Sequence, residues 1–287
     1  MKDIAPIAPP LPKALQDLFE ARLATGEIDL PFLPDTASQV MSACNDEVCE
    51  PRKVAELIER DQALSAHVLH IANSAAYAPT ESIVSLPQAV SRLGLSTVCD
   101  IAVAVAIKGR VFRVPGHQVK VRELWQHSAM AGCYAKEIAR LRRFNVEGAF
   151  SSGLMHDVGR PMVMQAFLDL LKGLTDKPAP YALLQAAMDQ FHARVGGLLV
   201  DQWGMPDWVK ASILHHHGYA EAPHSEEDVM CTHLADELVK WASRSELGEE
   251  DFDFDLPVLS DLNLYRDEVE LLLQRRSSVL DVAESFL

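Results

Sequence analysis

The chain has 287 residues, of which 48% are hydrophobic and 23% are charged. This length suffices for a sizeable core in one or two domains, and the composition is that of an ordinary globular protein, which excludes extensive disorder. The formal net charge of −15 argues against direct nucleic-acid binding, because an acidic surface repels the phosphate backbone.

Cysteine usage and apolar segments predict a cytoplasmic protein. The five cysteines form no CxxC pair, and the N-terminus lacks the uninterrupted apolar core of a signal peptide, so we expect reduced thiols. The longest strongly apolar run, residues 101–107, is far shorter than the roughly 20 residues that a bilayer requires. No membrane insertion is therefore expected.

Helical periodicity follows a proline-rich start and continues through the first half of the chain. Residues 11–26 place Leu18 and Phe19 on one face and stop at Gly26, a residue that favours a helix end. Residues 101–107, IAVAVAI, alternate like a strand, but their alanine content favours a helix. The other helices of this half are predicted at 33–45, 51–61, 63–77, 86–94 and 95–111.

Val114, Pro115 and Gly116 form the densest turn signal in the middle of the chain and predict a subdomain boundary. Helical periodicity resumes beyond them, with no convincing hairpin signal and no repeat of fixed period. We expect helices at 121–143, 147–174, 179–204, 206–218, 227–245 and 262–280. Residues 246–287 contain 12 acidic and three basic residues and predict an acidic helical end. The whole chain is predicted to be all-α.

The 11 histidines are unevenly placed, and several share apolar helices with acidic residues. His156 and Asp157 are adjacent and precede Gly159, a residue that permits close backbone approach. A lone helical histidine is more often a satisfied core or surface residue, and this pair alone is compatible with that interpretation. The set as a whole indicates a site, and its members are Glu123, His127, His156, Asp157, His192, His216, His217 and Asp236.

A metal centre explains this set economically, because buried polar groups are costly unless paired and one cation pairs with many. Neutral imidazoles with carboxylates suit iron, manganese, zinc or nickel rather than calcium. Two metals bridged by Asp157 are expected to generate a hydroxide that attacks phosphorus in line. Arg160 is expected to hold the phosphate oxygens, so Asp157 and Arg160 are the predicted catalytic residues.

The order of these motifs resembles the HDOD branch of the HD-domain superfamily. The second half contributes WQHS at 125–128, GLMHDVG at 153–159, the run 192–217 that ends in HHH, and LADEL at 234–238. The first half contributes 33–45, 58–77 and 85–98, which resemble the helical part that distinguishes HDOD proteins from other HD proteins. The resemblance covers roughly residues 27–245.

This resemblance implies a multi-helix HD-type bundle preceded by an HDOD-type helical subdomain. We expect an N-terminal extension and helix at 1–26, the HDOD-type subdomain at 27–115, the metal-binding subdomain at 116–245 and the acidic helical segment at 246–287.

The resemblance also implies roles for the candidate residues. The ligands of HD hydrolases correspond to His127, His156, Asp157 and Asp236, with Asp157 as the bridging carboxylate. The additional ligands of HD-GYP phosphodiesterases correspond to Glu123, His192, His216 and His217. Those enzymes hold two or three divalent metals, so two or three are expected here, with iron or manganese favoured and zinc or nickel as alternatives.

Two features depart from the HD-GYP pattern. Arg160 stands where HD-GYP proteins have lysine, which keeps the charge but changes its geometry. The histidine run is followed by GYAEAP and not by a GYP segment. Cyclic di-GMP is therefore not the expected substrate.

Two functions remain open at this point. The first is a metal-dependent phosphohydrolase of the HDOD signal-transduction class, acting on a phosphomonoester or phosphodiester such as a nucleotide. The alternative is a catalytically silent bacterial signalling output or scaffold module with a structural metal or a ligand-sensing site. The expected partners are a phosphate-containing small molecule and a protein signalling partner, with no nucleic acid and no membrane.

Overall fold

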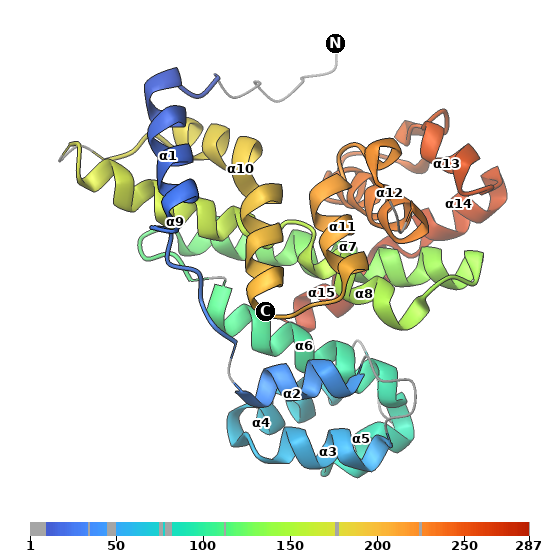
Figure 1. Cartoon of the computed structure of the whole chain (residues 1–287). Coiled ribbons are helices and arrows are strands. Elements are labelled where there is room, and N and C mark those ends of the chain that lie inside the picture. The colour runs from blue at the N-terminus through green and yellow to red at the C-terminus, as the bar shows by residue number, and fades with distance from the viewer. Residues whose placement is uncertain are drawn as a thin grey trace.

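The computed structural model describes residues 10–33, 35–44, 50–74, 77, 82–111, 113–175, 178–223 and 226–286. Every regular element in these ranges is a helix, and no strand occurs among them. The prediction of an all-α fold is therefore confirmed (Figure 1).

The first half of the chain forms a group of short helices at the bottom of Figure 1. They are α2 (Asp35–Cys44), α3 (Pro51–Glu59), α4 (Gln62–Ala72), α5 (Leu86–Leu93) and α6 (Leu95–Val111). Asp61 and Ser85 start two of them, because their side-chain oxygens accept hydrogen bonds from backbone amides of the first turn. The helices α2 to α5 all contact α6, whose Ile101, Ala104 and Ile107 are fully buried. The alternating run is thus helical, as predicted.

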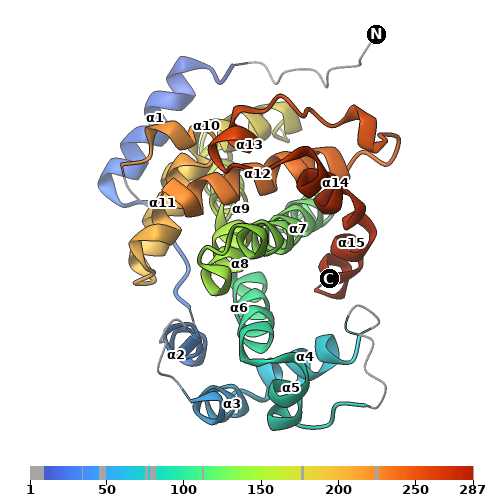
Figure 2. The same cartoon turned by 90° about the vertical axis from the view of Figure 1, so that its right-hand side faces the viewer.

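The second half is built around α7 (Gln118–Arg142), which has 25 residues. It contacts α8 (Val146–Met155), α9 (Gly159–Lys172) and α12 (Glu226–Ala242), and α10 (Tyr181–Gln202) and α11 (Asp207–His215) pack on these helices. The other elements of this half are η1 (Tyr219–Glu221), η2 (Glu249–Asp251), α13 (Pro257–Asp261), α14 (Arg266–Gln274) and α15 (Arg276–Ser285), and the last two also contact α7. Figure 2 shows α7 and α8 between α6 and α12, and α15 beside α7.

Two predicted helices are each broken in the structure. Residues 147–174 form α8 and α9 around a turn at 156–158, and residues 262–280 include α14 and α15, which are separated at Arg275. The backbone angles stay helical at His156 (φ −52°, ψ −37°) and Val158 (φ −56°, ψ −26°), so no local signal marks the first break. Tertiary packing decides it, because α8 packs on α7 whereas α9 packs on α10.

The first helix, α1 (Lys13–Thr25), packs on the second half of the chain. Phe19 is fully buried, and its ring centroid lies 5.6 Å from that of Phe167 and 4.7 Å from that of Phe191. The helix ends at Gly26, whose φ of 70° is in the left-handed region that favours glycine. The division of the chain at 26, 115 and 245 stays a prediction.

The thiols and the helix lengths bear on the predicted location. Cys99 is disulfide-bonded, so the expectation of reduced thiols is wrong for this residue. Cys133 and Cys231 are free. Within the described ranges, no helix combines the length and the apolar character that crossing a membrane requires. The cytoplasmic location itself stays a prediction.

Gly159 begins α9 at the point where this helix approaches α10 most tightly. A Cβ atom at this position would lie 2.0 Å from the carbonyl oxygen of His192 and 2.7 Å from the backbone nitrogen of Gly196. Only a residue without a side chain fits there, so the glycine sets the spacing of the two helices. The close approach of the two helices at Gly159 serves their packing. The same approach brings the 156–158 turn next to His192.

Replacing Gly159 with Ala is expected to lower the free energy of unfolding by about 3 kcal/mol, at the upper end of the range for overpacking. The matched control is Gly109→Ala in α6, where an added Cβ would meet nothing within 4 Å. That change should be neutral or stabilise the helix by up to about 1 kcal/mol. Urea denaturation followed by circular dichroism checks both, and equal stability of the two variants contradicts the packing argument.

Candidate metal centre

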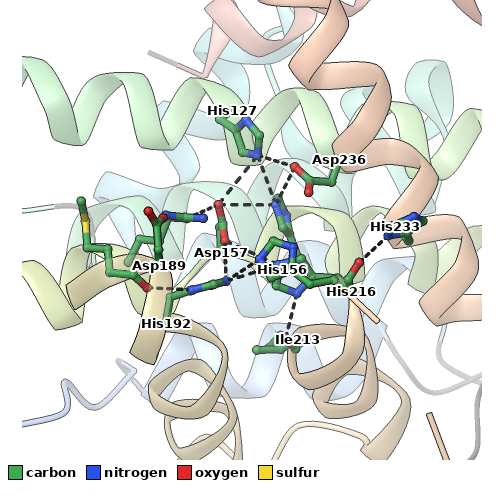
Figure 3. Close-up of polar contacts among 12 residues, drawn as sticks. His127, His156, Asp157, Asp189, His192, Ile213, His216, His233 and Asp236 are labelled. Carbon is green, nitrogen blue, oxygen red and sulfur yellow. Dashed lines mark hydrogen bonds and ion pairs between the residues drawn. The ribbon is translucent and has the colours of Figure 1, made fainter. Parts of the chain in front are cut away.

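Seven of the eight predicted ligand residues lie together in the second half, five of them buried, His127 half-buried and His217 exposed. His127 comes from α7, His192 from α10 and Asp236 from α12. The 156–158 turn contributes His156 and Asp157, and the residues directly after α11 contribute His216 and His217. We call these seven residues the His/Asp cluster. Elements remote in sequence therefore converge on one point (Figure 3).

Asp157 lies at the centre of the His/Asp cluster, and its two oxygens face different imidazoles. Oδ2 lies 3.8 Å from Nε2 of His127 and 3.6 Å from Nε2 of His156. Oδ1 lies 3.3 Å from Nε2 of His192 and 3.7 Å from Nε2 of His216. The carboxylate therefore stands between two groups of nitrogen atoms, as a bridging ligand would.

Backbone contacts fix which imidazole nitrogens face the centre. Nδ1 of His156, His192 and His216 lies 2.7, 2.8 and 2.8 Å from the carbonyl oxygens of Gly153, Met188 and Ile213, respectively. A carbonyl oxygen only accepts, so each Nδ1 carries the hydrogen. In the neutral imidazole the lone pair is then on Nε2. All three Nε2 atoms face the interior of the cluster, and in the neutral rings of His192 and His216 they carry the lone pair.

The inward-facing nitrogens lie close enough together to need a proton or a cation between them. Nε2 of His127 is 3.2 Å from Nε2 of His156, and Nε2 of His192 is 3.1 Å from Nε2 of His217. Two lone pairs at this separation repel unless a proton or a cation lies between them. In addition, Oδ1 of the buried Asp157 has no hydrogen-bond donor within the described part of the chain. This donor set fits a divalent cation.

The protonation states agree with a ligand role. Burial lowers the pKa of His192 to about 4 and holds that of His216 well below its usual value, so both are neutral at pH 7. Burial acts to raise the pKa of Asp157, but Arg160 and the surrounding histidines lower it well below its usual value. Burial also opposes ionisation of Asp236, yet hydrogen bonds from His127 and His156 lower its pKa well below the usual value. The centre thus presents ionised carboxylates beside the neutral imidazoles of His192 and His216, whereas at His156 the charges of Asp157 and Asp236 outweigh burial and raise the pKa.

Glu123 is not brought into the His/Asp cluster. It lies one turn before His127 on α7, but its side chain is 57% exposed and accepts a hydrogen bond from Lys120 at 2.8 Å. Glu123 and His127 both line a pocket of about 660 Å³ at this side of the cluster. Glu123 is therefore at the entrance, and its assignment as a ligand stays a prediction.

Arg160 is held between two carboxylates. Its Nε donates to Oδ2 of Asp157 at 2.6 Å, and its Nη1 donates to Oδ1 of Asp189 at 2.7 Å. On the other side of the centre, Lys240 lies 2.8 Å from Oδ2 of Asp236. Sequence reasoning missed Asp189 and Lys240, although each stands three or four helical positions from a cluster residue, at the spacing of a shared helix face.

In protein stripped of metal, His192 is expected to weaken folding as the pH falls from about 6.5 to about 4. Its buried imidazole resists protonation in that range, whereas the unfolded chain takes up a proton there. The contribution is on the order of 3 kcal/mol, present above pH 6.5 and lost towards pH 4. His192→Gln should flatten this part of the profile in urea titrations with a chelator. A variant with the wild-type pH dependence contradicts the assignment.

Comparison with known proteins agrees with this architecture. The model of the HDOD domain family matches residues 30–219. An uncharacterised protein of Treponema pallidum (strain Nichols) is 26% identical over 211 residues, which make up 71% of this chain. The match covers 40% of that relative, so the chain spans about two fifths of the relative's length.

Two solved structures are similar to this fold. A Shewanella amazonensis protein, provisionally named a metal-dependent phosphohydrolase, has a TM-score of 0.71 and 18% identity, with 96% of this chain and 98% of that chain covered. A Marinobacter aquaeolei protein, provisionally named a signal transduction protein, has a TM-score of 0.73 and 20% identity, with 95% and 66% covered. At these identities the likeness concerns the fold. Because the family model spans most of its length, this chain belongs to the HDOD family.

Proposed function

We propose that the His/Asp cluster holds two divalent cations and that the protein uses them to hydrolyse a phosphate ester. The observation that carries this proposal is the convergence of four imidazole Nε2 atoms on Asp157, whose Oδ1 accepts no hydrogen bond within the described residues. Uncompensated lone pairs and a buried carboxylate are costly, and cations between them remove the cost.

The arrangement of donors divides into two subsites that share Asp157. His127, His156 and Asp236 stand on the side of Oδ2, and His192 and His216 stand on the side of Oδ1, with His217 next to His192. Iron or manganese suits such mixed nitrogen and oxygen sets, with zinc and nickel as alternatives. A third ion would need Glu123 to exchange its contact with Lys120 for a metal.

A pair of divalent cations lowers the pKa of water and offsets the negative charge of a phosphate group during in-line attack. The residues of the chain supply the rest of the chemistry. Arg160 fixes the orientation of Asp157, because its Nε donates to Oδ2 of that carboxylate. Its second partner, Asp189, has a side chain that is 48% exposed, so a phosphate oxygen can take the place of Asp189 on Nη1.

The alternative function, a signalling output or scaffold module with a structural metal, has its own supporting observation. All seven residues of the His/Asp cluster lie at or beyond α7, so α2 to α6 supply none of its side chains. A helical group that the site does not use is suited to contact a protein partner. The Marinobacter protein with a similar fold is provisionally named for signal transduction.

Metal analysis tests the first step of the proposal. Protein purified without chelators is expected to contain about two ions of iron or manganese per chain, by mass spectrometry of the dissolved metal. Asp157→Asn should lose most of both ions, because it removes the shared negative ligand, whereas His192→Gln should lose about one. His215→Gln is the matched control, since this neighbour of His216 lies outside the cluster. Metal-free wild-type protein would contradict the proposal.

Turnover tests the second step. Manganese-loaded protein, and iron-loaded protein kept anaerobic, should release phosphate or nitrophenol from a panel of nucleotides, p-nitrophenyl phosphate and bis(p-nitrophenyl) phosphate. Asp157→Asn should reduce the rate to background. Arg160→Gln should raise KM and lower kcat, since it removes both the phosphate contact and the support of Asp157. Protein that holds two ions but turns over no substrate would favour the signalling alternative.

A further inference from the structure

A second pocket, of about 450 Å³, lies where α6 ends and α7 begins. Its volume is within the range of small-molecule sites, about 300–1,000 Å³. It is lined by cationic residues, Lys108, Arg113 and Arg122, and by apolar ones that include Val114 and Val121. The segment between the two helices, which joins the two halves of the chain, forms one of its walls.

The charge of this pocket is opposite to that of the chain. Three cationic side chains and no acidic side chain line it, although the chain has a formal net charge of −15. Within the described ranges, neither Arg113 nor Arg122 forms an ion pair or a hydrogen bond with another side chain. Surface cations in an acidic protein ordinarily pair with acidic neighbours. The positive charge of these two guanidinium groups is therefore available to an anionic ligand.

Lys108 contributes to the positive field from a fixed position. Its Nζ donates to the carbonyl oxygen of Phe286 at 2.6 Å, at the C-terminal end of α15. Burial and the nearby charge of Arg122 lower the pKa of Lys108. Arg122 is therefore close enough to Lys108 for the two positive charges to interact.

Apolar residues also line the pocket. Val114, Val121 and Trp125 are buried residues that also line the pocket. The indole nitrogen of Trp125 donates to the carbonyl oxygen of Phe286 at 3.2 Å, so the ring is held in place. A ligand that fits this lining combines an anionic group with an apolar or planar body.

We propose that this pocket binds a small phosphorylated molecule of nucleoside monophosphate size, with Arg113 and Arg122 on the phosphate. Two guanidinium groups match the double negative charge of a phosphomonoester and its planar pairs of oxygens. The valines and Trp125 contact the rest of the ligand. The site does not depend on the proposed metal centre or on hydrolysis.

The pocket and the metal centre use different faces of α7. Gln118, Arg122 and Trp125 are spaced by four and three residues and line the pocket, whereas His127 belongs to the His/Asp cluster. Consecutive helical residues point in directions about 100° apart. Arg122, on the pocket face, and Glu123, which lies one turn before His127 on the face of the metal centre, therefore differ in direction by that angle. A ligand in the pocket contacts α6 and α7 together, which makes it a candidate effector that links the two halves.

Calorimetric titration of the full chain with AMP, inorganic phosphate and adenosine tests this site. AMP should bind more tightly than phosphate, and phosphate more tightly than adenosine. The variant Arg113→Gln/Arg122→Gln should weaken AMP binding at least tenfold. The control Arg52→Gln/Arg266→Gln removes the same charge from exposed helical positions and should bind AMP as the wild type does. All variants should keep the wild-type circular dichroism, since these arginines are exposed.

Asp157→Asn separates this site from the metal centre and should leave AMP affinity unchanged. Loss of AMP binding in that variant would move the ligand to the His/Asp cluster and overturn the proposal. Equal affinity in the wild type and in the Arg113/Arg122 variant would overturn it too. The same holds if the wild type shows no saturable binding of AMP, or if AMP binds no more tightly than phosphate.

Discussion

The crowding of imidazole nitrogen atoms around one buried carboxylate is the constraint on which the rest of this structure depends. Folding brings His127, His156, His192 and His216 towards Asp157, with three of the rings held by backbone carbonyls so that their Nε2 atoms face inward. Such an arrangement is unfavourable without positive charge at its centre. The surrounding helices must therefore supply packing energy to keep it, and a resident cation would reverse the balance.

The packing around the centre meets this requirement with small residues at helix contacts. Gly159 lets α9 touch the backbone of α10, and Gly153 lets α8 approach the backbone of α7 at Ala131, where a Cβ would lie 2.5 Å from the carbonyl oxygen. These contacts flank the 156–158 turn on both sides. The position of Asp157 is thus fixed by contacts between the backbones of neighbouring helices. Such contacts allow less movement than contacts between flexible side chains.

Much of the fold follows from local signals in the sequence, and much of the site follows from the motifs. Gly26 and the apolar spacing around Phe19 predict the extent of α1, and alanine content identifies α6 as a helix despite its alternation. The break at 156–158 could not be predicted, because its residues keep helical angles and only the packing of α8 and α9 on different partners separates them. Glu123 and His127 have the same helical spacing as a ligand pair, yet Lys120 engages Glu123 at the surface. The spacing alone does not show that Lys120 competes with a metal for the carboxylate of Glu123.

The placement of α1 has a topological consequence. Phe19 packs between Phe167 and Phe191, and the latter immediately precedes His192. The segment containing α2 to α6 is therefore an insertion, flanked in sequence by two parts of a single body. The contact between α1 and α10 joins residues that are about 170 positions apart in the sequence. Bringing two such distant segments together costs chain entropy, and this cost slows folding. A nascent chain keeps α1 without its partners until α9 and α10 have been synthesised, so the helix bundle around the histidines is completed late.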